Sequence, residues 1–195
     1  MTRSNMGSDA RGEVALAVQA ALDEHGYERL TTAKIADHYA NSEAGLYYYF
    51  DSKDEMIAAF LEHSATYLSE DLLGVDTDDP ETALREACEF LFRTPDHEYA
   101  GIAVAIMELL SHAPYNETLR EPLLELESAC LESLTDIVAA GVEQEVFRPV
   151  DSRATAAFLL AAADGSTGIN VALDMGLGED LRTGWSAYVD SLLAE

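Results

Sequence analysis

Basic residues are scarce in this sequence. Among 195 residues there are 11 lysines and arginines against 37 aspartates and glutamates, so the formal net charge is −26 at pH 7. The acidic residues are spread along the whole chain, and apolar residues recur regularly between them, so the charge does not indicate disorder. Because dissolved salt screens repulsion between like charges, this balance favours a surface adapted to concentrated salt, as in the cytoplasm of an extreme halophile. An acidic protein of an ordinary cytoplasm is the alternative.

Cysteines are also few, and long apolar segments are missing. Cys88 and Cys130 lack CxxC spacing and are expected on different helices, where we interpret them as buried structural thiols. A redox-sensing pair is the alternative, which the rarity of cytoplasmic disulfides disfavours. No segment approaches about 18 uninterrupted apolar residues. Residues 1–12 lack the apolar core of a signal peptide. These absences predict a cytoplasmic protein that does not cross a membrane.

The sequence contains none of the motifs that carry common enzyme chemistry. There is no GxSxG, no GxGxxG and no Walker loop. His97 and Glu98 lack the second histidine of a zinc-binding HExxH motif. Glu108 and His112 lie one helical turn apart, a spacing more typical of a solvated pair than of two metal ligands. We therefore expect no catalytic residues, no metal site and no cofactor.

The spacing of apolar residues predicts an all-α protein of about nine helices, with no strands. Hydrophobic residues make up 48% of the chain, which is enough for a sizeable core. The expected helices cover residues 9–25, two short segments between 31 and 50, about 52–73, a segment beginning at Pro80, and about 98–112, 116–145, 152–175 and 179–193. The fourth of these helices is expected to run from the DNA-binding part into the next domain without a linker. We place a domain boundary at residues 55 and 56, which gives domains of 9–55 and 56–195.

The segment from Thr31 to Lys53 has the pattern of two short helices joined by a tight turn. Thr31 or Thr32 can accept a hydrogen bond from the first helical turn, and Ser42 is expected to do the same for the second helix. The first helix has an inward face made of Ile35, Ala36 and Tyr39, with Asp37 and His38 on the other side. A small residue at position 36 suits two helices that cross closely at a turn.

The second short helix carries unusual residues on its outward face. Leu46, Tyr49 and Phe50 are expected to point inward. The outward residues are then Glu43, Ala44, Gly45, Tyr47 and Tyr48. Small side chains let a helix approach another surface closely, and phenol groups can bond phosphate oxygens. This face therefore favours contact with DNA, whereas a local aromatic cluster with Tyr39 and Phe50 is the alternative.

These residues resemble the N-terminal helix-turn-helix of the TetR family of transcriptional repressors. The resemblance covers about residues 11–62, and its matching positions are Gly26-Tyr27, Thr31-Thr32, Ile35-Ala36, Ser42, Leu46-Tyr47-Tyr48-Tyr49-Phe50 and Ser52-Lys53. Two positions depart from the family pattern. Ala40 stands where the family usually has a turn glycine, and Glu43 stands where it often has lysine. Glu43 loses a phosphate contact but can accept from a cytosine amino group.

The resemblance implies a three-helix DNA-binding domain followed by a helical domain for ligand binding and dimerisation. The expected function is a sequence-specific transcriptional regulator: a homodimer on an inverted-repeat operator, a repressor that a small molecule releases. The expected DNA-binding residues are Thr32, Lys34, Asn41, Ser42, Glu43, Ala44, Gly45, Tyr47, Tyr48 and Lys53. A helical adaptor that binds only protein, or a small all-helical enzyme, is the alternative.

The helices of the C-terminal domain suggest two further sites. Apolar residues favour a pocket for a lipophilic effector among the fourth to seventh helices, near Phe60, Tyr67, Phe92, Met107 and Leu110, although an ordinary core uses the same residues. Small residues in the last two helices favour a homodimer interface, for which we select Leu160, Asp164, Gly165, Gly168 and Trp185. A buried contact within one chain is the alternative for this second group.

Overall fold

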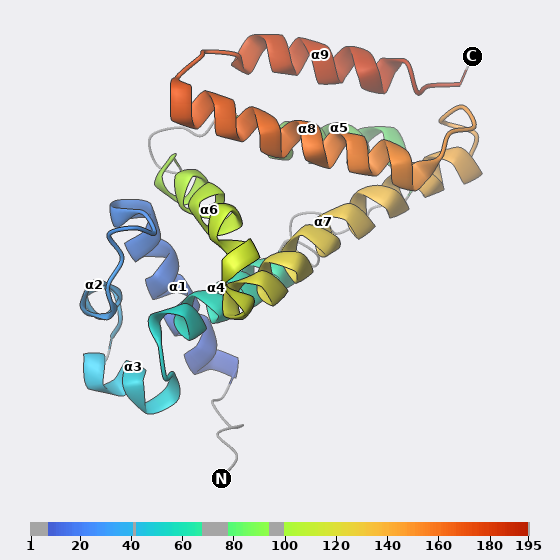
Figure 1. Ribbon diagram of the computed structural model, residues 1–195. Helices are drawn as coiled ribbons and strands as arrows, with labels where there is room; N and C mark the ends of the chain where they lie inside the picture. Colours follow the sequence, from blue (N-terminus) through green and yellow to red (C-terminus); the bar gives the residue numbers. More distant parts are fainter. Residues whose placement is uncertain (1–7, 41, 68–77, 94–99, 195) are drawn as a thin grey trace. The chain divides into compact units, whose positions relative to one another are not determined.

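A computed structural model of the chain describes residues 8–40, 42–67, 78–93 and 100–194 (Figure 1). Its elements in order are α1 (Ser8–His25), α2 (Thr32–Asp37), α3 (Glu43–Tyr49), α4 (Lys53–Tyr67), α5 (Pro80–Leu91), α6 (Ala100–His112), the 3-10 turn η2 (Ala113–Tyr115), α7 (Glu117–Glu143), α8 (Ser152–Leu173) and α9 (Gly178–Asp190). Within these ranges, β pairing is limited to one bridge between Phe147 and Leu193. The all-α prediction is confirmed.

The chain divides into two compact units. Unit 1 comprises residues 1–66 and 96–126, and unit 2 comprises 67–95 and 127–195. Helices α1 to α3, most of α4, α6 and the first turns of α7 therefore belong to unit 1. Unit 2 contains α5, the rest of α7, α8 and α9. The functional division into residues 9–55 and 56–195 stays a prediction.

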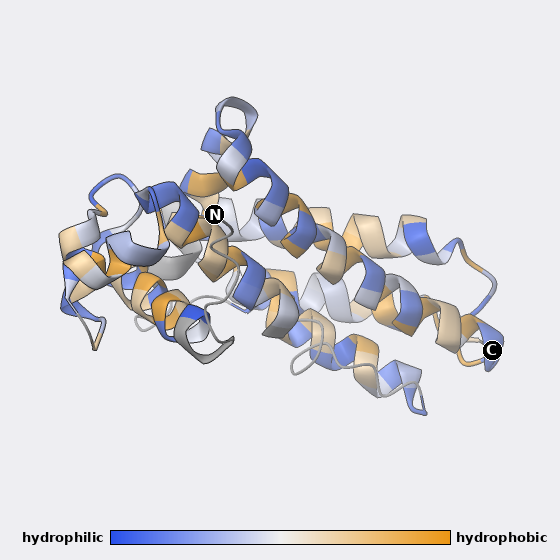
Figure 2. Ribbon diagram, turned by 90° about the horizontal axis from the view of Figure 1, so that it is seen from below, coloured by the Kyte–Doolittle hydropathy of each residue, from blue (hydrophilic) through white to orange (hydrophobic). Residues whose placement is uncertain are grey.

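Unit 1 is built around the apolar side of α1. Val14, Val18 and Leu22 are buried on this helix, as its apolar spacing predicts. Their partners in the core come from the next three helices and include Ile35, Leu46, Ile57 and Leu61. The helices carry hydrophobic and hydrophilic residues side by side along their lengths, as amphipathic helices do (Figure 2). The short helices α2 and α3 are therefore held by packing, because helices of six or seven residues are unstable alone.

Unit 2 has one continuous apolar core that includes both cysteines. Leu84, Leu134, Phe147 and Leu159 are buried there with Cys88 and Cys130. Desolvation raises the pKa of each thiol to about 12, so both stay protonated and unreactive near neutral pH. Helices α8 and α9 run antiparallel (Figure 1), and the rings of Phe158 and Tyr188 meet with centroids 5.1 Å apart. The interpretation of the cysteines as buried structural thiols is confirmed.

The last helix ends earlier than its apolar spacing predicts. Helix α9 was expected to reach residue 193 but stops at Asp190. Beyond it the chain pairs with the loop that follows α7: the Arg148 N–H donates to the Leu192 carbonyl, and the Ala194 N–H donates to the Val146 carbonyl. These backbone bonds replace the helical ones, so the C-terminal end is tied to a segment almost fifty residues away in sequence. Periodicity alone cannot reveal such a partner.

We predict that Gly141→Ala destabilises unit 2. A Cβ atom at position 141 would overlap the ring of Phe147, which is almost completely buried and cannot move aside freely. Overpacking of this kind costs about 1 to 3 kcal/mol. Gly184→Ala is the matched control, because a Cβ there meets nothing within 4 Å. Urea denaturation followed by circular dichroism should show a lower midpoint for Gly141→Ala only. Equal midpoints for Gly141→Ala and the native chain would contradict the packing described here.

Candidate nucleic-acid interface

Helices α2 and α3 form the predicted helix-turn-helix. Thr31 is the N-cap of α2, and its hydroxyl accepts from the Lys34 N–H at 3.3 Å. Ile35 and Tyr39 are buried and Ala36 is half-buried, whereas Asp37 is exposed, so the predicted faces of the first helix are confirmed. The turn that follows includes Asn41, which lies outside the described residues. Capping at Thr31 and apolar spacing therefore predict where this first helix lies, while packing against α1 holds it in place.

The start of α3 differs from the prediction in one respect. Ser42 occupies the N-cap position, but its hydroxyl makes no capping hydrogen bond. The prediction of a side-chain cap at Ser42 is therefore wrong. Its main-chain carbonyl instead accepts from the Gly45 N–H at 2.8 Å, which closes the first turn. The exposed Ser42 hydroxyl therefore makes no hydrogen bond to the backbone of α3.

The outward face of α3 is exposed as expected, with one correction. Tyr48 is 74% exposed and Tyr47 is 49% exposed, while Leu46 and Phe50 are buried. Tyr49, predicted to point inward, is exposed and packs edge-on against the ring of Tyr48 at 4.8 Å. The reason lies at Phe50, which is the C-cap in an extended conformation with φ −122°. Because the chain leaves the helical conformation at Phe50, the Phe50 side chain is buried in the core and Tyr49 stays on the surface.

Glu43 and Ala44 complete this surface, and a polar cluster connects it to α2. Thr32 Oγ1 donates to Glu43 Oε1 at 2.8 Å and lies 3.0 Å from the Tyr47 hydroxyl. A threonine hydroxyl has a single proton, so in this arrangement Tyr47 donates to Thr32. Three of the predicted DNA-binding residues thus hold one another in place. The Tyr47 hydroxyl can donate to a phosphate only by giving up Thr32, although its oxygen can accept without any rearrangement.

Both lysines of the chain hold the loop that precedes α2. Lys34 Nζ donates to the Arg29 carbonyl at 2.7 Å, and Lys53 Nζ donates to the Leu30 carbonyl at 3.4 Å. The Lys53 ammonium group also lies 4.5 Å from the centre of the Tyr27 ring, a cation–π contact. An ammonium group has three donors, so each lysine retains donors that could reach a phosphate. Their role in DNA binding stays a prediction.

The first turn of α4 places Lys53 beside this loop. The sequence Ser52-Lys53-Asp54-Glu55 has the spacing of a capping box, and Ser52 Oγ accepts from the Glu55 N–H at 3.2 Å as that motif requires. The reciprocal bond is displaced by one residue, because Glu55 Oε2 accepts from the Asp51 N–H at 2.7 Å. The helix start is therefore doubly capped, which fixes the position of Lys53 within its first turn.

The residues selected for an effector pocket belong to different units. Phe60 is buried and Met107 and Leu110 are half-buried in unit 1, whereas Phe92 is buried in unit 2. Tyr67 ends α4, and its side chain lies outside the described part. Unit 2 itself contains a hollow of about 410 Å³ between the end of α5 and the start of α9. It is lined by Glu89, Phe92, Arg93, Gly178, Glu179, Arg182 and Trp185.

The hollow combines apolar walls with a charged rim. Arg182 forms an ion pair with Glu89 across it. Phe92 was predicted as a pocket residue and Trp185 as an interface residue, and the fold brings them together here. The other five lining residues were missed, because local spacing does not tell which helices face each other. The predicted pocket among the fourth to seventh helices stays a prediction.

Unit 2 also contains two partly desolvated carboxyl groups, Glu127 and Asp164, that lie close to each other. Desolvation raises the pKa of Glu127 from its usual value near 4.5 to about 7, and the negative charge of Asp164 adds to this rise. Asp164 as a whole is exposed to solvent. Its carboxyl group is nevertheless desolvated, which raises the pKa of Asp164 as well. Among the described residues no cationic side chain forms an ion pair with either carboxyl. The two groups therefore form an acidic site without a counter-charge of its own.

The residues selected for a homodimer interface differ in their exposure. Asp164 and Gly165 lie on the exposed side of α8, and a Cβ at Gly165 would meet nothing within 4 Å. Gly168 and Trp185 are half-buried. Leu160 packs into the core of unit 2, so it cannot present much surface to a partner. Apolar spacing does not distinguish a position that packs within the chain from one that faces a partner, so the assignment of these residues to a dimer interface stays a prediction.

Comparison with known protein families assigns both parts of the chain. Residues 19–60 match the family described as "Bacterial regulatory proteins, tetR family". Residues 80–194 match the family described as "BetI-type transcriptional repressor, C-terminal". The second match alone covers more than half of the chain.

Individual relatives agree with this assignment. The repressor NicS of Pseudomonas putida is 26% identical over 166 residues, 83% of this chain and 76% of NicS. The nucleoid occlusion factor SlmA of Haemophilus influenzae is 51% identical over 47 residues, but the match spans only 24% of this chain and 22% of SlmA. The chain thus matches about a fifth of the length of SlmA.

Solved structures extend the comparison to the whole fold. A TetR transcription regulator from Haloarcula marismortui is 32% identical, with a TM-score of 0.80, and covers 95% of this chain and 99% of its own. A regulator from Saccharomonospora viridis, solved in complex with choline, has a TM-score of 0.79 at 19% identity and covers 96% of this chain and 99% of its own. At 19% identity, the similarity to the Saccharomonospora viridis regulator shows a shared fold only.

We predict that Tyr47→Phe weakens DNA binding for all sequences alike. The phenol oxygen is the atom placed to accept or donate at the surface of α3, and a lost phosphate hydrogen bond costs about 1 kcal/mol, or roughly fivefold in affinity. Tyr115→Phe is the matched control, since Tyr115 is 90% exposed and lies outside the helix-turn-helix. Mobility shifts on specific and random DNA measure the change. Unaltered affinity, or loss of the fold, would show that Tyr47 has a structural role instead.

The raised pKa of Glu127 predicts how stability depends on pH. The folded state binds this proton more tightly than the unfolded state, so the contribution of Glu127 to stability falls as pH rises from about 4.5 to about 7. Glu127→Gln should remove this decline and make the protein more stable than the native chain at pH 8. Glu125→Gln, at an exposed position two residues earlier, is the control for removing one negative charge. If urea denaturation gives the same pH profile for both variants, Glu127 is not desolvated as described.

Proposed function

The chain belongs to the TetR family of DNA-binding transcriptional repressors, with a C-terminal region of the BetI type, and from this we propose that it acts as a homodimer on an inverted-repeat operator. A regulator of this family works by binding DNA and is not an enzyme. In the part of the chain that the structure describes, no helix is both long and apolar enough to cross a membrane. We place its activity in the cytoplasm, where the DNA is.

The exposed face of α3 is the observation that carries the DNA-binding proposal. This face presents Glu43, Ala44, Tyr47 and Tyr48, and it is braced from α2 by Thr32. Small and aromatic side chains of this kind have no reason to be gathered on a solvent-exposed helix unless another surface approaches it. In our proposal α3 lies in the major groove, the tyrosines contact the backbone, and Glu43 contacts base edges. A protein-binding adaptor could also use an exposed aromatic face, but it would not explain why this face lies on the second helix of a helix-turn-helix.

Dimerisation is proposed because one α3 can read only a few base pairs. The exposed side of α8 supplies a suitable surface: Phe158 is 57% exposed and Ile169 is 42% exposed, with Ala161 and Gly165 between them. Residues at this spacing share one side of a helix, and small residues among them permit close packing with a second helix. We propose that α8 and α9 of two chains pack together. Asp164 would then lie at the margin of that contact.

Release from DNA is proposed to follow the binding of a small molecule. Three residues separate α3 from α4, and at Tyr67 helix α4 reaches the point where the chain passes from unit 1 to unit 2. A ligand that favours one position of α4 over another would change the spacing of two recognition helices. The apolar residues Phe60, Met107 and Leu110 support a lipophilic effector, with the DNA-bound state favoured in its absence.

A cationic effector is a second candidate, and Glu127 and Asp164 favour it. Both carboxyls are desolvated, the charge of Asp164 further raises the pKa of Glu127, and neither has an ionic partner among the described residues. A protonated amine or a quaternary ammonium ion would restore the missing counter-charge. The choline-bound relative shows that the fold accepts such a ligand elsewhere. Choline should raise the melting temperature of the native chain but not of Glu127→Gln if this candidate is right.

The proposal is tested by selecting operators from random DNA with the purified protein in concentrated salt. The enriched sequence should be an inverted repeat with half-site centres about 34 to 36 Å apart, or a multiple of that distance. Light scattering should show two chains per DNA molecule. An asymmetric site bound by a single chain would overturn the dimer proposal. Failure to enrich any sequence would favour the adaptor, because a protein-binding surface has no preference among DNA sequences.

A further inference from the structure

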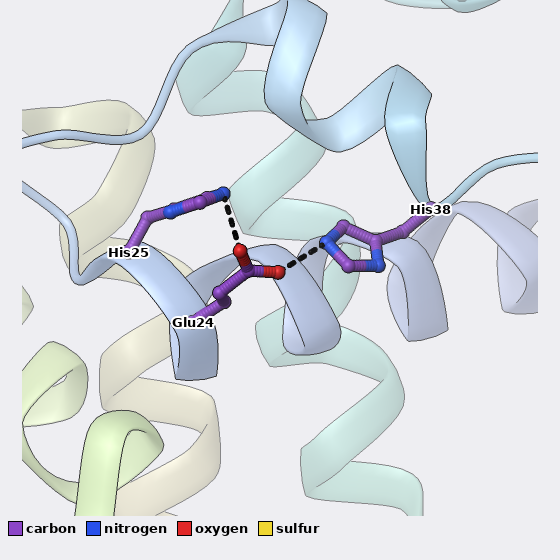
Figure 3. A group of neighbouring side chains, drawn as sticks. All are labelled: Glu24, His25 and His38. Carbon is purple, nitrogen blue, oxygen red and sulfur yellow. Dashed lines mark ion pairs between the residues drawn. The ribbon is translucent and has the colours of Figure 1, made fainter.

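Three side chains that no part of the proposed function uses meet on unit 1. Glu24 and His25 are the last two residues of α1, and His38 is the C-cap of α2. Glu24 Oε2 lies 3.3 Å from His38 Nε2, and Glu24 Oε1 lies 3.7 Å from His25 Nε2. The carboxylate sits between the two imidazole rings, which approach it from different helices (Figure 3). All three donor atoms lie within 4.8 Å of one another.

The donor set and its spacing match those of a transition-metal site. Two imidazole nitrogens with one carboxylate oxygen form a common protein ligand set for zinc, with one position left to water. Metal–ligand distances of about 2.0 to 2.2 Å at a tetrahedral angle place neighbouring donors about 3.3 to 3.6 Å apart. The 3.3 Å separation lies within this range and the 3.7 Å separation lies just above it, so side-chain rotations that bring the three donors closer together would complete the site. We propose that Glu24, His25 and His38 bind one divalent transition-metal ion, such as Zn²⁺.

The charge around the cluster favours a cation. Asp23 and Asp37 flank it in the sequence, and residues 1–62 hold eleven acidic against five basic residues, a formal charge of −6. Histidine and glutamate side chains here are accessible, with 23%, 29% and 61% exposure for His25, His38 and Glu24, so an ion can enter from solvent. The neighbouring pair of His112 and Glu28 has the same 3.3 Å separation but offers only two donors.

The site links the ends of the two helices that enclose the loop before α2. A bound ion would join the carboxyl end of α1 to the C-cap of α2, which directly precedes the turn into α3. It would also place two positive charges on a domain that must approach a polyanion while short of cations. The ion therefore braces the helix-turn-helix and offsets part of its negative charge. Sequence spacing could not show this, because twelve residues, including a loop, lie between His25 and His38.

The competing interpretation is a set of ion pairs without metal, in which Glu24 neutralises protonated histidines. Titrating the full-length protein with Co²⁺ separates the two, because a site with nitrogen and oxygen ligands changes the visible absorption of the ion. The titration is best run in about 1 M KCl, where weak attraction of cations to the acidic surface is screened. We expect saturation at one ion per chain, and Zn²⁺ should displace the Co²⁺.

Variants decide which residues hold the ion. Glu24→Gln and His38→Gln should each weaken binding at least tenfold, since even loss of a residue that only orients a ligand costs about 10- to 100-fold. His38→Cys should retain binding, because a thiolate is also a zinc ligand. The double variant Glu28→Gln and His112→Gln is the matched control and should bind as the native chain does. Circular dichroism checks the fold of each variant.

Two outcomes would overturn the proposal. One is a Co²⁺ titration of the native chain that rises without saturating, which would indicate only the general attraction of an acidic surface. The other is unchanged, one-to-one binding in the folded Glu24→Gln and His38→Gln variants, which would place the ion elsewhere. Neither outcome bears on whether the protein binds an operator, so the metal site and the regulatory function are tested separately.

Discussion

Repulsion between an acidic protein and a polyanion is the constraint to which the DNA-binding part of this regulator must conform. A net charge of −26 leaves few cations to neutralise phosphates, and the two lysines are bonded to the carbonyls of Arg29 and Leu30. Besides the remaining donors of these lysines, the surface available to DNA consists mainly of hydroxyl groups and small side chains on α3. Affinity must then come from close fit and hydrogen bonds more than from charge pairing. Concentrated salt, which screens the repulsion, is the condition under which we propose that this arrangement works.

The rigidity of the helix-turn-helix follows from the same constraint. Thr32, Glu43 and Tyr47 hold one another, and Lys53 is fixed by a loop carbonyl and the ring of Tyr27. A surface that cannot rely on long-range attraction gains from being ordered before it meets DNA, because little entropy is then lost on binding. The metal ion proposed for Glu24, His25 and His38 would serve the same end by joining two helices. The bound ion would thus both order the helix-turn-helix and offset part of its negative charge.

Local features of the chain were predictable from sequence, and tertiary ones were not. The cap at Thr31, the buried Ile35 and Leu46 and the capped start of α4 all follow from short-range spacing. Tyr49 was misplaced because Phe50 leaves the helical conformation, which periodicity cannot anticipate. The hollow between α5 and α9 and the approach of Glu127 to Asp164 depend on which helices pack together. Such pairings are set by the whole core, so they are visible only in the folded structure.

The dependence of operator affinity on salt tests the central claim most directly. For an ordinary DNA-binding protein, affinity falls with rising salt, with a log-log slope of about −0.9 for each phosphate neutralised. Binding is to be titrated against KCl in the range where circular dichroism shows the protein folded, in the presence of a chelator so that metal content stays constant. We predict an affinity that is flat or rises with KCl up to molar concentrations. A steep decline would contradict it, because it would require a basic surface that carries the interaction.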